Sequence, residues 1–326
     1  MTQLRIGVLG ASRIAEVAIV EPARILGHRL VACAARERAR AETFAQKYGV
    51  ERVLDSYQDV IDDPEIDVVY NPLANSLHAP WNLAAIGAGK PVLTEKPFAR
   101  DAAEATTVAD AASAAGITVM EGFHYLFHPV TKRLQQLVEN GTLGELEYVE
   151  VVMRMPAPEA GDHRWSFDLA GGVMMDLGCY GLHAQRLFGQ YAGGDPKVVS
   201  ASAVERTAGV DESIDVHLEF PNGATGVSRN SMIDPDYLFS LKVVGSAGEA
   251  LAHNFIKPNE DDRVSVTIGS ETTVENLGKR TSYTYQLEAF AAHVLGGAAL
   301  PLDARDAVTN MALIDDGYRA AGMSPR

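Results

Sequence analysis

Two stretches of the chain carry side chains whose types and spacing suit proton transfer. The first, Glu95-Lys96-Pro97, follows directly on a short apolar run. The second, GGVMMDLGCYGLH, begins at Gly171. In a helix, its residues Asp176, Tyr180 and His183 stand at positions i, i+4 and i+7 and share one face. An ammonium group, a carboxylate, a phenol and an imidazole are therefore candidates for one site.

The chemistry that these groups suit is oxidation of an alcohol, in which the hydroxyl proton is removed while a hydride leaves the carbon. An ordinary tyrosine, with a pKa of about 10, is a poor base at pH 7. A neighbouring ammonium favours the phenolate and lowers this pKa. If the two stretches meet in the fold, Tyr180 as the acid–base group and Lys96 as its electrostatic partner form a coherent pair, with Asp176 orienting Lys96 or binding a second substrate hydroxyl; the resemblance described below implies that they meet. His183 stays open as the alternative proton acceptor, although a hydrogen bond within the core also explains a histidine there.

A turn near the start of the chain, GVLGASRIA, lies between an apolar run and a helix pattern. From Gly10 to Ala15 it follows the dinucleotide-binding pattern G-x-G-x-x-G/A, except that Ser12 replaces the second glycine. Gly10 permits the tight turn, and Ser12 offers a hydroxyl to a phosphate beside the N–H groups of the next helix. We predict that the turn binds a nicotinamide dinucleotide, the alternative being a glycine turn without a ligand. The predicted contact residues are Gly10, Ala11, Ser12, Arg13 and Ile14.

The choice of cofactor depends on the residues about 20 positions further on, where NAD enzymes place Asp or Glu against the ribose 2′-hydroxyl. This chain has Ala35-Arg36 there. A guanidinium can hold a 2′-phosphate with its planar fork, and Arg38 and Arg40 add positive charge. We predict a preference for NADP, with NAD as the alternative cofactor and a solvated strand-end arginine as the alternative explanation of Arg36.

Composition excludes several classes of partner. The 326 residues are 47% hydrophobic, and 43 acidic against 28 basic residues give a net charge of −15. This charge repels phosphate backbones, so we expect no nucleic-acid partner. We also expect no membrane partner, because no apolar run reaches the roughly 20 residues that span a bilayer. No signal-peptide pattern is visible, and Cys33 and Cys179 are expected to be separate reduced thiols, so we predict a cytoplasmic location.

Short β-rich runs alternate with helix patterns over residues 1–121. The strand runs are Leu4–Leu9, Leu30–Ala34, Val68–Tyr70, Val92–Thr94 and Ile117–Met120, and the helix patterns are Arg38–Tyr48, Ala79–Ala88 and Ala102–Ala115. Apolar strands alternating with helices predict a doubly wound parallel sheet, the Rossmann architecture. Glu95-Lys96-Pro97 would then lie at the carboxyl edge of the sheet, where such sheets bind ligands.

Residues 122–326 show consecutive strands joined by short turns. The strand patterns are Leu146–Met155, Val198–Glu205, Ile214–Phe220, Ala224–Met232 and Leu238–Val244, and the helix patterns are Pro129–Gly141, Val173–Phe188 and Arg305–Ala321. Pro221-Asn222-Gly223 is a hairpin turn. The predicted fold class is therefore α/β, with an N-terminal Rossmann domain for NADP (1–121) and a C-terminal α+β domain on an antiparallel sheet (122–326).

Together with NPLANSLH (Asn71–His78) and EGFHYLFHP (Glu121–Pro129), these motifs resemble those of the glucose–fructose oxidoreductase/inositol dehydrogenase family, Gfo/Idh/MocA. The resemblance covers nearly the whole chain in the right order and is strongest to the branch of dimeric dihydrodiol dehydrogenases and NADP-dependent xylose dehydrogenases. It implies hydride transfer between the nicotinamide and a carbon of a sugar, polyol or cyclic dihydrodiol. It also implies a large, mostly antiparallel second sheet whose open face forms a homodimer or homotetramer, and thus a substrate-binding and oligomerisation domain.

The resemblance also implies roles for individual residues. Lys96, Asp176 and Tyr180 occupy the catalytic positions. Further cofactor contacts are implied for Leu73, Asn75, His78 and Glu95, and candidates for the substrate pocket are His124, Tyr125, Trp165 and His183. The chain departs from the family pattern at Ser12, at Leu126, where Arg is frequent, and at Tyr180, where sugar dehydrogenases often have His.

Two alternatives bear on this interpretation. His124 and His128 could indicate a metal, but no third ligand has suitable spacing, so we expect none. A non-catalytic NADP(H)-sensing regulator with the same fold is the competing function. The presence of both Lys96 and Asp176 argues against it.

Overall fold

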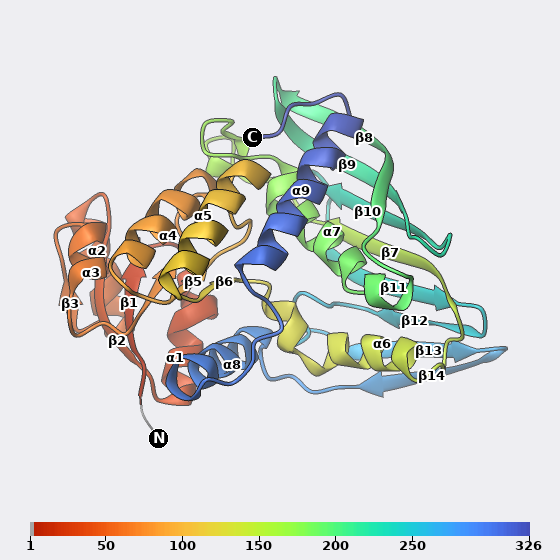
Figure 1. Cartoon of the computed structure of the whole chain (residues 1–326), viewed down its shortest axis with the longest axis horizontal. Helices are drawn as coiled ribbons and strands as arrows, with labels where there is room; N and C mark the ends of the chain where they lie inside the picture. The colour runs from red at the N-terminus through yellow and green to blue at the C-terminus, as the bar shows by residue number, and fades with distance from the viewer. Residues whose placement is uncertain (1–2) are drawn as a thin grey trace. The chain divides into compact units, whose positions relative to one another are not determined.

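The structure, a computed structural model, describes residues 3–326, which form two compact units (Figure 1). Unit 1 comprises residues 3–123 and 283–309, and unit 2 comprises residues 124–282 and 310–326. The segment 283–309 thus differs from the sequence expectation, which places it in the second domain. Its helix α8 (Ser282–Gly296) buries Leu287 and Phe290, and His293 Nε2 lies 2.8 Å from Thr118 Oγ1. Such long-range packing leaves no local pattern in the sequence.

Unit 1 is built on a six-stranded parallel sheet in the order β3-β2-β1-β4-β5-β6. Its strands are β1 (Arg5–Leu9), β2 (Arg29–Ala34), β3 (Arg52–Val53), β4 (Val68–Asn71), β5 (Val92–Thr94) and β6 (Val119–Glu121). This is the order of the doubly wound dinucleotide-binding fold, so the predicted fold class is confirmed for this unit. The strand order reverses between β1 and β4, and ligands of such sheets bind there, outside the carboxyl ends of the strands.

The helices of unit 1 begin and end where the local chemistry favours it. They are α1 (Glu21–Leu26), α2 (Arg38–Tyr48), α3 (Tyr57–Asp62), α4 (His78–Gly87), α5 (Ala102–Ala115) and α8. Asp101 caps α5 by accepting a hydrogen bond from the N–H of Glu104. Gly49 and Gly116 end α2 and α5 in the left-handed conformation, with φ of 73° and 65°. Helix α1 is preceded by a π-helix, Glu16–Val20, directly after the predicted cofactor turn.

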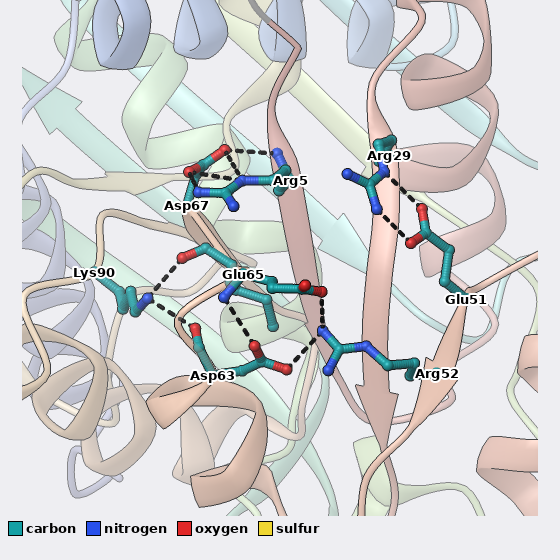
Figure 2. Close-up of polar contacts among 9 residues, drawn as sticks. Arg5, Arg29, Glu51, Arg52, Asp63, Glu65, Asp67 and Lys90 are labelled. Carbon is teal, nitrogen blue, oxygen red and sulfur yellow. Dashed lines mark hydrogen bonds and ion pairs between the residues drawn. The ribbon is translucent and has the colours of Figure 1, made fainter.

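Paired charges occupy the amino ends of the strands in unit 1, and Figure 2 shows them side by side. Arg5 Nη2 lies 2.6 Å from Asp67 Oδ1, and Arg29 Nη2 lies 2.6 Å from Glu51 Oε2. Arg52 pairs with both Asp63 and Glu65, and Lys90 donates to the carbonyls of Asp63 and Ile66. Because these arginines already have carboxylate partners, this edge is stabilised by contacts within the unit. The candidate ligand edge is the opposite one.

Unit 2 is built on an eight-stranded sheet in the order β14-β13-β12-β11-β7-β10-β9-β8. Its strands are β7 (Leu146–Arg154), β8 (Lys197–Thr207), β9 (Val210–Glu219), β10 (Thr225–Ser231), β11 (Leu238–Gly245), β12 (Gly248–Ala252), β13 (Arg263–Ile268) and β14 (Glu271–Asn276). Within the described strands of this eight-stranded sheet, only β7 and β10 pair in parallel, so the expected mostly antiparallel sheet is confirmed.

Helices α6 (Pro129–Glu139) and α7 (Cys179–Arg186) pack against this sheet (Figure 1). Helix α9 (Ala304–Ala320) has its first residues assigned to unit 1 and the rest, from Asn310, to unit 2. The predicted helix Val173–Phe188 is a π-helix, Met174–Gly178, followed by α7. A π turn contains more residues than an α turn. Asp176 lies within the π-helix and Tyr180 within α7, so the spacing between them is not the uniform α-helical spacing of the prediction.

The less buried face of the sheet in unit 2 carries several ion pairs. Arg229 of β10 pairs with Glu150 of β7 and Asp215 of β9. Lys242 of β11 pairs with Glu249 of β12. Val152, in register with Arg229, is half-buried on this same face. The resemblance to the family implies an open sheet face, and this face of unit 2 carries both polar and apolar side chains.

Candidate active site

Three loops that follow neighbouring strands of unit 1 contain the predicted cofactor residues and Lys96. The turn at Gly10 follows β1, the loop Leu73–His78 follows β4, and Glu95-Lys96-Pro97 follows β5. Gly10 has φ of 89°, and a Cβ there would lie 2.9 Å from Leu73 Cδ2. Only glycine fits this position well, because a side chain meets both backbone strain and the second loop. The two loops are therefore packed together at the point where the strand order reverses.

The hydroxyl of Ser12 has the features of a phosphate ligand. Its Oγ is shielded from solvent and has no hydrogen-bond partner within residues 3–326. An unsatisfied buried hydroxyl costs about 1–3 kcal/mol, which a phosphate oxygen would recover by accepting its hydrogen bond. Ala15, three residues further on, is fully buried, as the close packing of the turn on the sheet requires. The residues present thus fit a dinucleotide pyrophosphate despite the missing second glycine.

His78 links the second loop to the third. Its Nε2 lies 2.9 Å from the carbonyl oxygen of Leu73, and its Nδ1 lies 2.7 Å from that of Pro97. The ring is 1% exposed. Asn71, the last residue of β4, donates to Asn82 Oδ1 of α4 at 2.8 Å, which ties the two ends of the second loop together. His78 therefore shapes the loop that contains Asn75 and fixes it against the segment that contains Lys96.

Lys96 is half-buried at the carboxyl end of β5, and its peptide bond to Pro97 is cis. Glu95 beside it is buried and accepts a hydrogen bond from Tyr70 Oη at 2.9 Å. Burial, together with the charge of Glu95, raises the pKa of Tyr70 well above its usual value, so Tyr70 stays a donor. Glu95 is thus held by the interior of unit 1, which fixes the backbone that presents Lys96.

Basic side chains surround the first turn, although the chain as a whole is acidic. Arg40 Nη2 lies 3.4 Å from the carbonyl oxygen of Ala11, and a hollow of about 370 Å³ lies between the turn and α2. Arg38 is paired with Glu42 and Asp55. Arg36, which follows Ala35 at the carboxyl end of β2, is exposed and makes no hydrogen bond or ion pair with residues 3–326. Arg36 is therefore available to a ligand.

Unit 2 contains a group of buried polar side chains that includes several of the predicted site residues. Tyr180 Oη lies 3.1 Å from His124 Nε2, and His124 Nδ1 lies 2.8 Å from Ser282 Oγ. Tyr125 Oη lies 2.6 Å from His183 Nδ1. Tyr180 is 4% exposed and His183 is 3% exposed. The adjacent residues His124 and Tyr125 therefore contact two polar side chains of α7, those of Tyr180 and His183.

Asp176 is held by a different partner. Arg164 Nε donates to Asp176 Oδ2 at 2.6 Å, and Arg164 Nη1 reaches Asp162 Oδ1 at 3.2 Å. Attraction to Asp176 is the largest cause that raises the pKa of Arg164, so this guanidinium stays charged. Trp165 follows in the chain and donates from Nε1 to the carbonyl oxygen of Pro158 at 3.2 Å. The 162–165 segment thus supports the carboxylate.

The predicted site residues therefore fall into two groups. Lys96 and the predicted cofactor residues belong to unit 1, whereas Asp176, Tyr180 and the substrate candidates belong to unit 2. Sequence reasoning missed Arg164 as the partner of Asp176 and missed the bond between His124 and Tyr180. No local signal could have revealed either, because the partners come from separate segments.

Two further findings bear on the class of protein. Among the helices of residues 3–326, none is both long and apolar enough to cross a membrane. In the same residues, no group of three or more His, Cys, Asp or Glu side chains is placed to hold a metal ion. Cys33 and Cys179 are free and buried, and burial raises the pKa of Cys33 to about 11.

The sheet order, the turn that fits a dinucleotide and the Lys96 segment define a Rossmann-domain oxidoreductase with a second, mostly antiparallel unit. Two family models match: an oxidoreductase family with an NAD-binding Rossmann fold over residues 4–123, and the GFO/IDH/MocA C-terminal domain over residues 131–251. The chain belongs to the Gfo/Idh/MocA oxidoreductase family, as the sequence motifs predicted.

Similar proteins include two curated enzymes. D-xylose 1-dehydrogenase (NADP(+)) 2 of Haloferax volcanii is 33% identical, over 97% of this chain and 96% of the relative. Trans-1,2-dihydrobenzene-1,2-diol dehydrogenase of Mus musculus is 31% identical, over 79% of this chain and 77% of the relative. A solved structure, a 3-ketoreductase from Actinomadura kijaniata in complex with NADP and TDP-benzene, has a TM-score of 0.88 at 27% identity, covering 96% of both chains.

Proposed function

We propose that this protein is an NADP-dependent dehydrogenase or reductase that acts on a carbinol or carbonyl carbon of a sugar, polyol or cyclic dihydrodiol. The observation that carries the proposal is the convergence of three loops at one sheet edge of unit 1. One loop offers the shielded hydroxyl of Ser12, one is fixed by His78, and one presents Lys96. The names of the similar proteins, a D-xylose dehydrogenase, a dihydrobenzenediol dehydrogenase and a 3-ketoreductase, support the substrate class.

In the proposed mechanism, the nicotinamide supplies the hydride acceptor for oxidation and the hydride donor for reduction. In the oxidation direction, Tyr180 Oη removes the proton of the substrate hydroxyl, and the positive charge of Lys96 stabilises the phenolate that accepts it. His124 holds Tyr180 Oη in place through the 3.1 Å contact. Asp176, fixed by Arg164, binds a second substrate hydroxyl. In the reduction direction Tyr180 returns the proton to the carbonyl oxygen.

The site has the elements of an enzyme rather than of a sensor. A sensor needs the nucleotide-binding loops, whereas the presence of both Lys96 and Asp176 favours an enzyme. An absorbance screen for NADP(H) turnover over aldoses, inositols, ketosugars and trans-dihydrodiols tests the proposal. Nucleotide binding without turnover of any of them would favour the non-catalytic regulator.

We propose a cytoplasmic location, which is consistent with the two free thiols, Cys33 and Cys179. Localisation of the fluorescently tagged protein in cells of its source organism would test this.

We expect a preference for NADP over NAD that depends on Arg36. An arginine–phosphate contact contributes about 1.5–3 kcal/mol, so Arg36→Asp should lower kcat/KM for NADP by roughly 10- to 150-fold and spare that for NAD. Arg24→Asp is the matched control, because Arg24 is an exposed arginine of α1 and the charge change is the same. Steady-state kinetics with NADP and with NAD measure this preference. Equal or better use of NAD by the wild type would refute the expectation.

We expect a homo-oligomer, a dimer or a tetramer, formed through the less buried face of the sheet in unit 2. Light scattering at micromolar concentration should give a mass at least double the 35.0 kDa of one chain. Val152→Asp should favour the monomer, because it places a charge among side chains that are already paired. A wild-type mass of one chain would contradict this assembly.

A further inference from the structure

A fully buried ion pair lies at the start of the segment that carries Asp176 and Tyr180. Arg326 Nη2 is hydrogen-bonded to Asp211 Oδ1, and neither side chain has any exposed surface. Arg326 comes from beyond α9, and Asp211 is the second residue of β9. The catalytic proposal uses neither residue. Because burying two charges carries a large desolvation penalty, such a pair is a weak source of stability. The other hydrogen bonds of the two side chains indicate what the ion pair does.

Those contacts are directed at the backbone of residues 171–174. Asp211 Oδ2 accepts a hydrogen bond from the N–H of Met174 at 2.7 Å, and Arg326 Nε donates to the carbonyl oxygen of Gly171 at 2.8 Å. Gly172 has φ of 114°, and a Cβ there would overlap Asp211 Oδ1. The carboxylate thus satisfies an N–H at the first residue of the π-helix Met174–Gly178. The pair holds both sides of the glycine pair from which this helix starts.

The same backbone is tied to the partner of Asp176. The N–H of Gly172 donates to the carbonyl oxygen of Arg164 at 2.8 Å, and the N–H of Asp176 donates to the carbonyl oxygen of Gly172 at 3.1 Å. The Arg164 side chain in turn holds Asp176 Oδ2. A displacement of Gly172 would therefore move both members of the Asp176–Arg164 pair.

The ion pair is itself enclosed on several sides. Tyr318 Oη donates to Asp211 Oδ1 at 3.1 Å, and the Arg326 guanidinium lies 4.2 Å from the centroid of the Tyr318 ring. The Phe167 ring lies at 5.5 Å from the same guanidinium. Burial raises the pKa of Asp211, whereas Arg326 and the Met174 N–H favour its ionised form. These contacts leave the pair little freedom to rearrange.

We infer that Asp211 and Arg326 are positioning residues, which fix the start of the π-helix so that Asp176 and Tyr180 are held in the geometry for turnover. This inference rests on the proposed function for its kinetic part only. Its structural part, the fixing of residues 172–180, holds whatever reaction the protein catalyses. We call this group, Asp211, Tyr318 and Arg326, the buried clasp.

The test compares Arg326→Met, the conservative Arg326→Lys and the mild Tyr318→Phe with the wild type. Arg326→Met should accelerate amide hydrogen exchange in residues 172–180 by about 10-fold or more, since the Met174 N–H loses its fixed acceptor. It should also lower kcat by about 100-fold, the typical effect of a misplacement near 1 Å. NADPH affinity, measured by fluorescence titration, should stay unchanged because the predicted cofactor residues lie in unit 1. Arg326→Lys should recover part of the loss, since an ammonium keeps the charge but lacks the planar fork.

Arg133→Met is the matched control. Arg133 forms a two-pronged ion pair with Glu275 in the same unit, at 2.7 and 2.8 Å, and has no contact with the clasp. This variant should leave kcat and the exchange of residues 172–180 at wild-type values, even where it lowers the Tm. If it lowers kcat as much as Arg326→Met does, the effect is general destabilisation and the inference fails.

Removal of one partner leaves an unpaired buried charge and can prevent folding. The double variant Asp211→Asn plus Arg326→Met avoids this, because it leaves no charge at the site. Together with Tyr318→Phe it decides the question if Arg326→Met does not fold. Wild-type exchange and wild-type kcat in folded clasp variants would overturn the inference. If the wild-type protein oxidises no substrate, the proposed function fails, whereas the exchange measurement still decides the role of the clasp.

Discussion

Replacement of Lys96 by Met should lower kcat by about 100- to 10,000-fold, the range expected for loss of acid–base assistance. Methionine has a similar length but no charge, so the phenolate of Tyr180 loses its stabilising cation in the transition state. NADPH affinity should change far less, because the Ser12 hydroxyl, the Arg36 guanidinium and the loop fixed by His78 all remain. Turnover with the best substrate of the screen and a fluorescence titration of NADPH measure the two effects separately.

Lys90→Met is the matched control for this variant. Lys90 belongs to unit 1 and donates to the carbonyls of Asp63 and Ile66 at the opposite edge of the sheet (Figure 2). Its replacement should affect the Tm but leave kcat unchanged. Near-normal turnover in Lys96→Met would mean that this lysine takes no part in the chemistry.

Replacement of Tyr180 by Phe should also lower kcat by about 100- to 10,000-fold with the fold intact. The change keeps the ring and its packing and removes only the oxygen that carries the proton and contacts His124. His183→Asn should have a smaller effect, mostly on stability, because His183 is buried and engaged by Tyr125 at 2.6 Å. Tyr148→Phe, the same change on the sheet of unit 2, is the control and should not alter turnover.

The pH dependence provides an independent check on the proton acceptor. A tyrosine base assisted by Lys96 should give an oxidation rate that rises through the alkaline range. A histidine base would give a rate that levels off above its ordinary pKa of about 6.5. If Tyr180→Phe keeps its activity while His183→Asn folds but does not turn over, His183 is the proton acceptor and the assignment of Tyr180 is wrong.

Much of unit 1 could be predicted from the sequence because its signals are local. The limits of α2 and α5 are as expected, since a glycine in the left-handed conformation ends each helix. The strand β3 and the helix α3 were missed, because two strand residues and six helical residues carry too little pattern. In unit 2 the hairpin turn Pro221-Asn222-Gly223 correctly joins the antiparallel strands β9 and β10. Strands β12, β13 and β14 were not recognised.

The sequence predicted some parts of the candidate site and missed others. The turn at Gly10 and the Glu95-Lys96-Pro97 segment were placed at the correct sheet edge, because in a parallel α/β sheet the residues after each strand share that edge. The shared helical face of Asp176, Tyr180 and His183 was drawn from uniform α-helical spacing, whereas the helix begins with a π turn, so that face stays a prediction. Tyr180 and His183 contact adjacent residues nonetheless, whereas Asp176 contacts Arg164.

The sequence by itself therefore determined the features that depend on near neighbours: the family, the Rossmann order of elements, the turn that suits a dinucleotide, and the absence of an acidic residue at Arg36. Only the tertiary structure decided the partners of buried polar groups. Tyr180 is satisfied by His124, Asp176 by Arg164, and Asp211 by Arg326, and the segment 283–309 returns to unit 1. The physical reason is that a buried donor or acceptor must be paired with whatever side chain the fold brings within reach. No spacing along the chain encodes that choice.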